Sequence, residues 1–280
     1  MAESINDLGN IYDITRSSSA SGVSAYGSVI VGRVTFGSRS YDAHAFKYAN
    51  GIMTDLGTLD GATSYLTQGG PYSVATGVSA DGSVIAGTSW YAGGASRFQA
   101  FKYANGTMTG LGFLGGGNYS YADGVSADGS VIVGSSYTLN NAKLEAFKYT
   151  NGTMTGLGNL GGNSGVNNSS ALGVSADGSV IVGRSWLDNT TFHAFKYANG
   201  TMTDLGSLDG SVGRSTAYAV SADGSTIVGN SYYTGGGTNS HAFKYANGTM
   251  TDLGSLTGSV GRSTDYAASA DGSVIVGESY

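Results

Sequence analysis

The side chains best suited to acid–base or metal chemistry recur at fixed positions of an internal repeat. Three histidines, His44, His193 and His241, share one position, which Gln99 and Glu145 occupy in two other copies. Histidines on separate repeats lie too far apart to share a metal ion, and the absence of cysteine excludes thiolate catalysis and cysteine-ligated zinc. We therefore predict a structural, hydrogen-bonding role for the histidines.

Aspartates form a second regular series, in the turn of the motif S-A-D-G-S. Its members are Asp81, Asp128, Asp177, Asp223 and Asp271. The first copy of the motif has Tyr26 at this position. A calcium-binding loop needs several alternating carboxylates and this motif has one, so we predict that these aspartates stabilise turns.

A third series combines acidic and basic side chains in the segments between consecutive copies of this motif. Asp55, Asp204 and Asp252 share a position that is Gly110 and Gly156 in two copies, so no carboxylate site is common to all repeats. The lysines of the series are Lys47, Lys102, Lys148, Lys196 and Lys244. A solvated strand face, or pairing with aspartate where one is present, accounts for them. The sequence predicts no catalytic residue, no metal site and no cofactor.

Two sequence elements alternate along the chain. The first reads GVSADGSVIVG, with copies at 22–32, 77–87, 124–134, 173–183, 219–229 and 267–277. The second reads HAFKYANGTMTDLG, with copies at 44–57, 99–112, 145–158, 193–206 and 241–254, and a fragment of it, INDLG, stands at 5–9. The turn aspartates are spaced 46 to 49 residues apart, so the repeat is about 47 residues long.

Each element has the composition of a β-hairpin. In the first, Ala-Asp-Gly separates two short runs of small and apolar residues, and glycine supplies the positive φ that the turn needs. In the second, Asn-Gly separates AFKYA from TMTDL, which is the strongest short-range signal for a hairpin. One repeat therefore predicts four short antiparallel strands, which we call A (GVS), B (SVIVG), C (HAFKY) and D (MTDLG).

This strand content predicts an all-β fold, a β-propeller of about six four-stranded blades, as a single domain over residues 1–280. Small residues in strand A suit the crowded axis, whereas Val, Ile, Phe and Tyr in strands B and C fill the space between blades. The sixth blade lacks a C strand, and we expect the strand at 5–9 to close the ring with residues 267–280. Five blades with a displaced last hairpin, and a β-solenoid, are the alternatives.

The composition excludes several classes of protein. The 280 residues include 48 Gly and 1 Pro without the period of collagen, and 40% of them are hydrophobic, enough for a folded core. A formal net charge of −6 without a basic stripe argues against nucleic-acid binding. No apolar run is long enough for membrane insertion, and residues 1–10 lack the charged and apolar regions of a signal peptide.

The HAFKY segment, the following G-x-M-T-D-L-G and the VSADGSVIVG hairpin resemble the HAF family of bacterial extracellular repeats. The resemblance spans nearly the whole chain and implies a secreted or cell-surface protein with no enzymatic activity common to the family. Gln99 and Glu145 depart from the triplet that gives the family its name, which argues against a functional role for the histidine. The order of the strands is also similar to the layout of a WD-type repeat.

Variation between the repeats is confined to the B–C and D–A connections. In an up-and-down blade these connections share one face, and the nearly invariant turns share the other. Binding sites on rigid scaffolds usually lie in such loops, which here are rich in Tyr, Trp, Ser, Asn and Gly. The candidate ligand-binding residues are Trp90, Tyr91, Tyr137, Trp186, Tyr232, Tyr233, Arg184, Arg214 and Arg262.

Aromatic rings beside polar groups suit a sugar ring or a protein partner. The same rings recur regularly, so packing over the core between blades also accounts for them. We predict a non-enzymatic secreted or surface protein that binds a glycan or a surface protein through this face, and a structural spacer without a ligand is the alternative. A hydrolase is disfavoured because strand A lacks the His, Asp, Glu and Arg that such sites place around a propeller axis.

Overall fold

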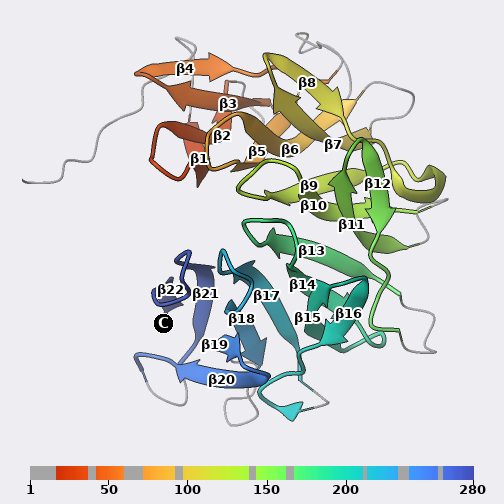
Figure 1. Ribbon diagram of the computed structural model, residues 1–280, viewed down its shortest axis with the longest axis vertical. Coiled ribbons are helices and arrows are strands. Elements are labelled where there is room, and N and C mark those ends of the chain that lie inside the picture. Colours follow the sequence, from red (N-terminus) through yellow and green to blue (C-terminus); the bar gives the residue numbers. More distant parts are fainter. Residues whose placement is uncertain are drawn as a thin grey trace, which may run out of the picture.

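The computed structural model describes residues 17–36, 42–59, 72–91, 97–138, 143–161, 167–210, 213–232, 240–257 and 261–280. These residues form six antiparallel sheets around a common centre (Figure 1). Five sheets have four strands and the last sheet has two. We number the sheets as units one to six in chain order.

The first three units contain twelve strands and one short helix. Unit one comprises β1 (Ser17–Val23), β2 (Val29–Thr35), β3 (Ala43–Ala49) and β4 (Ile52–Asp55). Unit two comprises β5 (Ser73–Val78), β6 (Val84–Tyr91), β7 (Arg97–Ala104) and β8 (Thr107–Gly110). After the 3-10 helix η1 (Leu114–Gly116), unit three comprises β9 (Ser120–Val125), β10 (Ile132–Tyr137), β11 (Leu144–Thr150) and β12 (Thr153–Gly156).

The remaining units follow the same order. Unit four comprises β13 (Ser169–Val174), β14 (Ile181–Trp186), β15 (Phe192–Ala198) and β16 (Thr201–Asp204). Unit five comprises β17 (Ser215–Val220), β18 (Ile227–Tyr232), β19 (Ser240–Ala246) and β20 (Thr249–Gly254). Unit six comprises β21 (Ser263–Ala268) and β22 (Ile275–Ser279).

Each four-stranded unit is an up-and-down sheet with its strands in the predicted order A, B, C, D. The A strands lie nearest the centre and the D strands lie at the outer edge (Figure 1). Because neighbouring strands are antiparallel, the A–B and C–D turns share one face of the molecule, which we call the turn face. The B–C and D–A connections share the opposite face, the loop face.

The structure confirms both predicted turns. In the C–D turns, Asn has a φ of 50° to 52° and the following Gly a φ of 77° to 79°, the conformations of a type I′ turn. In an A–B turn, Asp177 Oδ1 accepts hydrogen bonds from Ser179 N at 2.9 Å and from Ser175 Oγ at 2.8 Å. These bonds, led by the one from the Ser179 amide, stabilise the carboxylate and lower the pKa of Asp177 to about 2.

Neighbouring units pack through one type of apolar cluster. It recurs at each boundary between consecutive units from unit one to unit five. The cluster between units four and five consists of Val180, Val182, Ala194, Leu205, Ala217, Ile227 and Phe243. The strand-C phenylalanines Phe46, Phe101, Phe147, Phe195 and Phe243 all have an exposed fraction of 0%. Strands B and C therefore fill the space between units, as the sequence predicts.

Backbone hydrogen bonds near the centre join the A–B turns of adjacent units. Each alanine amide donates a hydrogen bond of 2.8 to 3.1 Å to the carbonyl oxygen of the next alanine in the series Ala25, Ala80, Ala127, Ala176, Ala222 and Ala270. This series reaches unit six, so the last hairpin continues the arc. The five-bladed alternative requires a displaced last hairpin, and this hydrogen bond contradicts it. The units also surround a centre instead of stacking in a line, which contradicts the β-solenoid alternative (Figure 1).

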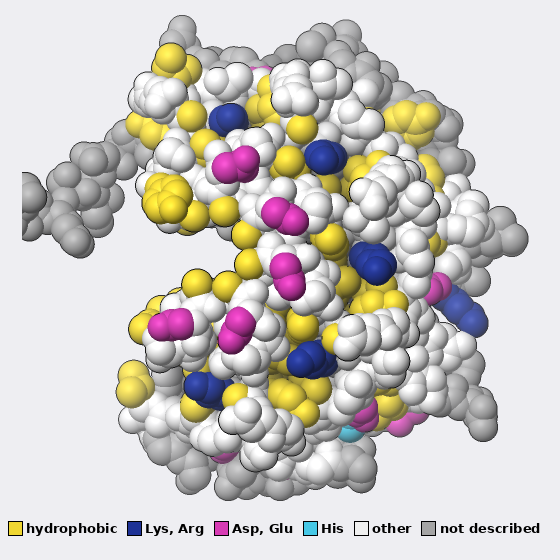
Figure 2. Space-filling view, in the orientation of Figure 1, with side chains coloured by type: hydrophobic (Ala, Val, Ile, Leu, Met, Phe, Trp, Pro, Cys, Tyr) yellow, Lys and Arg dark blue, Asp and Glu magenta, His cyan; other side chains and the backbone are white. Residues whose placement is uncertain are grey.

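The described residues leave the arc open between units one and six. Figure 2 shows this opening, with hydrophobic side chains on both of its sides. The same view shows acidic side chains on an inner arc and basic side chains on an outer arc around the centre. The strand predicted at 5–9 lies outside the described residues, so its closure of the ring stays a prediction.

Candidate functional site

A β-bulge in every A strand sets which residue faces the centre. In unit three, Ala122 and Gly124 pair with consecutive residues of β10, which leaves Asp123 without a cross-strand partner. A bulge re-aims the side chain of the extra residue. The extra residues of units one to six are Ser21, Thr76, Asp123, Leu172, Tyr218 and Tyr266.

Three of these bulge residues, Thr76, Asp123 and Leu172, line a cavity of about 490 Å³. Small-molecule sites typically enclose roughly 300–1,000 Å³. The other lining residues are Tyr72, Val74, Thr88, Phe98, Tyr121, Ala122, Ser135, Leu144, Ser170 and Arg184. With the bulge residues, they come from the A strands of units two to four as far as the bulge, from the B strands of the same units and from the starts of the C strands of units two and three, and Tyr72 directly precedes β5. The pocket therefore lies at the centre, on the loop-face side.

Aromatic rings form one wall of the pocket. The rings of Tyr72 and Phe98 meet edge to face with 5.6 Å between centroids, and Phe98 lies 6.2 Å from Tyr121. Leu144 and Leu172 extend this apolar wall. Rings and aliphatic groups of this kind can pack against the apolar face of a ligand.

Asp123 and Arg184 supply the charge of the pocket. Burial raises the pKa of Asp123 to about 7, and the positive charge of Arg184 partly opposes this rise. No hydrogen bond or ion pair joins either side chain to another described residue, although Arg184 lies 5.6 Å over the Phe192 ring. Both groups therefore remain available to hydrogen-bond a ligand near neutral pH.

The pocket continues into a cluster of rings and guanidinium groups on the loop face of units four and five. The guanidinium of Arg214 lies 5.6 Å from the Phe192 ring centroid and 5.9 Å from that of Tyr232. Trp186 packs against Phe192 with 5.0 Å between centroids. Arg184 belongs to both the pocket and this cluster, so the two form one surface.

The predicted binding residues divide between these places. Of the nine, Arg184 lines the pocket, and Trp186, Tyr232 and Arg214 lie in the adjoining cluster. Tyr137 packs against Tyr119 at 6.0 Å between centroids.

The other four predicted residues lie elsewhere. Trp90 and Tyr91 end β6, where the Trp90 amide donates to Tyr72 O at 2.7 Å. Arg262 pairs through its backbone with Tyr280 in unit six. Tyr233 lies outside the described residues.

The expectation that strand A lacks charged and large side chains is wrong. Tyr121, Asp123, Tyr218, Asp265 and Tyr266 all lie on A strands. The sequence does carry a signal for them, because they occupy the positions that change between copies of an otherwise repeated strand. Strand A therefore gives no reason to disfavour a hydrolase, and only the side chains of the pocket bear on that question.

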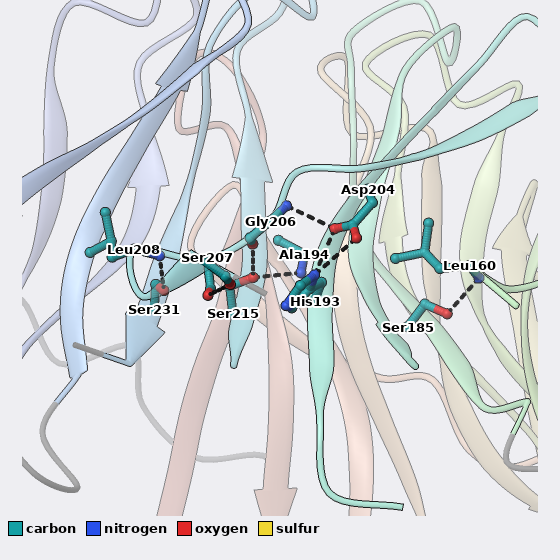
Figure 3. A network of polar contacts seen from close by, with 11 residues as sticks. Leu160, Ser185, His193, Ala194, Asp204, Gly206, Ser207, Leu208, Ser215 and Ser231 are labelled. Atoms are coloured by element: carbon teal, nitrogen blue, oxygen red, sulfur yellow. Dashed lines mark hydrogen bonds and ion pairs between the residues drawn. The ribbon is translucent and has the colours of Figure 1, made fainter. Parts of the chain in front are cut away.

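The structural role predicted for the histidines is confirmed. His193 Nδ1 lies 2.9 Å from both carboxylate oxygens of Asp204, and Asp204 Oδ1 accepts the amide hydrogen of Gly206 at 2.7 Å (Figure 3). Ser215, the first residue of β17, joins this network of unit four, since its hydroxyl accepts from Ala194 N at 2.8 Å and donates to Gly206 O at 2.5 Å. The histidine thus anchors the D–A connection beside the loop face.

Units two and three replace the histidine and aspartate together. A Cβ atom added to Gly156 would lie 2.2 Å from Glu145 Oε1, and one added to Gly110 would lie 2.2 Å from Gln99 Oε1. Glu145 Oε1 accepts the amide hydrogen of Gly158 at 3.1 Å, which is the role of Asp204 in unit four. One longer side chain therefore fills the space of two shorter ones.

The lysines do not pair with these aspartates, which contradicts one of the two predicted accounts. The aspartates contact histidine instead, whereas Lys47 Nζ lies 3.5 Å from Gly82 O and Lys244 Nζ lies 3.4 Å from Gly272 O of the next unit. Within the described ranges, no group of three or more His, Asp or Glu side chains could hold a metal ion. In the same part of the chain, no helix has the length and apolar character needed to span a membrane.

Comparison with known proteins gives the fold and no family. No family model matches the chain, and no curated protein matches it. Among solved structures, a TolB protein of Agrobacterium tumefaciens matches with a TM-score of 0.53 and 13% identity, over 84% of this chain and 79% of that one.

Two further matches are partial. TolB of Acinetobacter baumannii has a TM-score of 0.50 and 15% identity, over 83% of this chain and 54% of that one. A structure from a study of two prolyl endopeptidases has a TM-score of 0.53 and 11% identity, over 84% of this chain and 34% of that one. The chain thus spans about half and about a third of these two proteins. At such identities the likeness shows the fold alone, and that fold is all-β and of the β-propeller type.

Proposed function

We propose that the chain is a non-enzymatic binding module of a secreted or cell-surface protein, and that it binds a glycan at the axial pocket and the adjoining loop face. The observation that carries this proposal is where the units differ. Residues that vary between copies of a close repeat, such as Thr76, Asp123 and Leu172, come together in one cavity. The HAF resemblance supplies the bacterial surface setting.

The pocket offers both kinds of contact that a sugar ring needs. The C–H face of a pyranose packs on aromatic rings, which Tyr72, Phe98 and Tyr121 provide. Sugar hydroxyls can donate to the carboxylate of Asp123 and accept from the guanidinium of Arg184. Glycoside hydrolysis generally uses a pair of carboxyl groups, and the described pocket lining holds one, which favours binding over turnover.

A glycan array followed by isothermal titration calorimetry tests the proposal. We expect Tyr121→Ala to weaken the binding of an array hit about tenfold or more, because the ring loses its contact with the sugar. Thr264→Ala is the matched control, since Thr264 has the repeat position of Tyr121 in unit six. Absence of any hit, or equal affinities of the two variants, would contradict the proposal.

The loop-face rings extend the proposed site. We expect the double variant Trp90→Ala with Trp186→Ala to weaken the binding of an oligosaccharide while leaving the binding of its terminal monosaccharide unchanged. This result would separate the loop face from the pocket. Unchanged binding of both ligands would remove these rings from the site.

The ionisation of Asp123 predicts a pH dependence. A carboxylate accepts hydrogen bonds from sugar hydroxyls better than a carboxylic acid does. Since burial raises the pKa of Asp123 to about 7, affinity should fall between pH 8 and pH 6. The variant Asp123→Asn should bind weakly at both values, without this change, and calorimetry at the two values distinguishes the cases.

A structural spacer is the second candidate function. The series of inter-unit hydrogen bonds from Ala25 to Ala270 favours it, because it makes a stiff arc without reference to any ligand. In that case glycan arrays and protein pull-downs both yield no ligand, and pocket variants keep the biological activity of the whole protein.

A further inference from the structure

The residue directly before each A strand has a constant backbone role and a varying side chain. In units two to six its carbonyl oxygen accepts a hydrogen bond of 2.7 to 2.9 Å from the amide of a tryptophan or tyrosine at the end of strand B or next to it. The residues at this position are Tyr72, Tyr119, Asn168, Arg214 and Arg262. Because this contact needs only the backbone, it does not select the side chain, and the differences at this position have another cause.

These differences give the loop face an aromatic part and a cationic part. Units two and three have tyrosine at this position, and Tyr72 lines the pocket. In unit five the same position places the Arg214 guanidinium 5.6 Å from the Phe192 ring centroid, and the Arg184 guanidinium also lies 5.6 Å from that centroid. Since Arg184 lines the pocket too, the two positive charges adjoin its aromatic wall.

The two guanidinium groups have no acidic partner in the described part of the chain, where neither Arg184 nor Arg214 forms an ion pair. Arg214 Nε donates to Thr190 O at 2.6 Å, which orients the guanidinium and leaves its Nη groups for a ligand. The nearby carboxylate of Asp188 instead accepts from the amides of Thr190 and Thr191 at 2.7 and 2.8 Å. In a chain with a formal net charge of −6, two such cations favour an anionic ligand group.

A carboxylate fits the geometry of this cluster. A guanidinium that stacks on an aromatic ring keeps its N–H donors at the edge, where they can bind a carboxylate through two parallel hydrogen bonds. Tyr218, the bulge residue of unit five, adds a hydroxyl to this region. Burial raises the pKa of Tyr218, and the nearby positive charge of Arg184 partly opposes the rise. The hydroxyl therefore keeps its proton at neutral pH and can donate to an anion.

Given the glycan-binding function proposed above, on which this step depends, we propose that the glycan carries a carboxylate, as a uronic acid does, and that Arg184 and Arg214 bind it. The sugar ring packs on the aromatic wall of the pocket. Its hydroxyls donate to Asp123 of unit three, whereas its carboxylate points toward Arg214 of unit five, because Asp123 would repel it. A neutral sugar lacks the group that Arg214 binds.

Calorimetry with matched pairs of oligosaccharides tests the proposal. Each pair consists of an oligomer of galacturonate, glucuronate or mannuronate and its carboxyl-reduced, neutral counterpart. We expect at least one uronate to bind about tenfold more tightly than its neutral counterpart, which is the effect of one hydrogen-bonded charged group. A sulfated galactan is the third ligand and distinguishes a carboxylate site from a sulfate site.

Protein variants assign the effect to the cationic part of the loop face. Arg214→Gln should weaken uronate binding about tenfold and leave binding of the neutral counterpart unchanged, because it removes a charged donor outside the pocket lining. Arg214→Lys should restore part of the affinity, since it keeps the charge without the two-pronged geometry. Lys196→Gln is the matched control for loss of one charge. Lys196 has the repeat position of Lys47, whose Nζ lies beside an A–B turn on the turn face.

Two results would overturn the proposal and leave the glycan-binding function intact. One is binding of a neutral glycan with no preference for the uronate in any pair. The other is a uronate preference that Arg214→Gln reduces no more than Lys196→Gln does. Tighter binding of the sulfated galactan than of every uronate would overturn the choice of a carboxylate. If no glycan binds at all, the proposed function itself fails.

Discussion

The boundary between units four and five and the boundary between units five and six use the same repeat positions, but only the first is closed. Leu205, Ile227 and Phe243 at the first boundary have exposed fractions of 7%, 1% and 0%. At the second boundary, Leu253 is 44% exposed and Ile275 is half-buried. Among the described residues, the sheet of β21 and β22 has two strands, so no strand-C phenylalanine covers these positions as Phe243 covers Leu205.

This difference shows that burial is not a property of the repeat sequence. Each unit is a thin sheet that cannot enclose its own apolar side chains, so its core is completed by the unit beside it. The same isoleucine or leucine is a core residue in one unit and a surface residue in the next. The same substitution should therefore cost less stability at an exposed position than at its buried counterpart in another unit.

The largest expected effect comes from a matched pair of isoleucines. Ile227→Ala should lower the free energy of unfolding by about 2 to 5 kcal/mol, the range for emptying a buried site. Ile275→Ala should cost less than half as much, because this side chain is already partly exposed. Urea denaturation followed by tryptophan fluorescence measures both, and equal losses would contradict the comparison.

A smaller effect is expected from Asp265, which stands where unit five has Ala217. Asp265 is 6% exposed, and its Oδ2 is buried without a hydrogen-bond partner. Replacing it by alanine removes a buried polar group, so Asp265→Ala should stabilise the chain by about 1 to 3 kcal/mol at pH 7. The reverse change, Ala217→Asp, should destabilise it by more, because that boundary is closed.

The effect of Asp265→Ala should depend on pH. Burial raises the pKa of Asp265 to about 6, above its ordinary value of 3.8. Below about pH 4 the carboxyl is protonated in both the folded and the unfolded chain, so the electrostatic part of the advantage vanishes. It grows between pH 4 and pH 6, where only the unfolded chain ionises, and is constant above. A thermal midpoint difference independent of pH would contradict this account.

Exchanging side chains between units three and four should have an intermediate effect. Gly156→Asp alone should destabilise unit three, because the new carboxylate would meet Glu145. In unit four, His193→Glu with Asp204→Gly should be close to neutral, since the pair then matches unit three. A double-mutant cycle should give a coupling of about 1 kcal/mol, and additive effects would show that the two positions are independent.

The smallest effect on stability is expected at the A–B turn of unit one, which has Tyr26 in place of the turn aspartate. Tyr26 is 94% exposed, and the flanking Ser24 and Ser28 match the serines that bond to Asp177. Tyr26→Asp should raise the thermal midpoint slightly. With a folded pKa near 2, as for Asp177, the gain should be present above about pH 4 and lost as the pH falls toward 2. Asp177→Tyr should give the opposite change.

Local chemistry made much of the fold predictable. Asn199-Gly200 and Asp177-Gly178 specify their turns within a few residues, so the strands and their order follow from the sequence. The ring of Phe195 was also predictable as a filler between units. The pocket was not, because Asp123 reaches the centre through a bulge, and a change of register depends on both paired strands.

The sequence by itself determined the hairpins, the four-stranded unit and the face on which the units differ. These features depend on backbone conformations that neighbouring residues select. Only the tertiary structure decided that Thr76, Asp123 and Leu172 from three units share one cavity, and that Leu253 is exposed where Leu205 is buried. Contacts between units depend on which sheet packs beside which. Repeats of nearly identical sequence do not by themselves specify that arrangement.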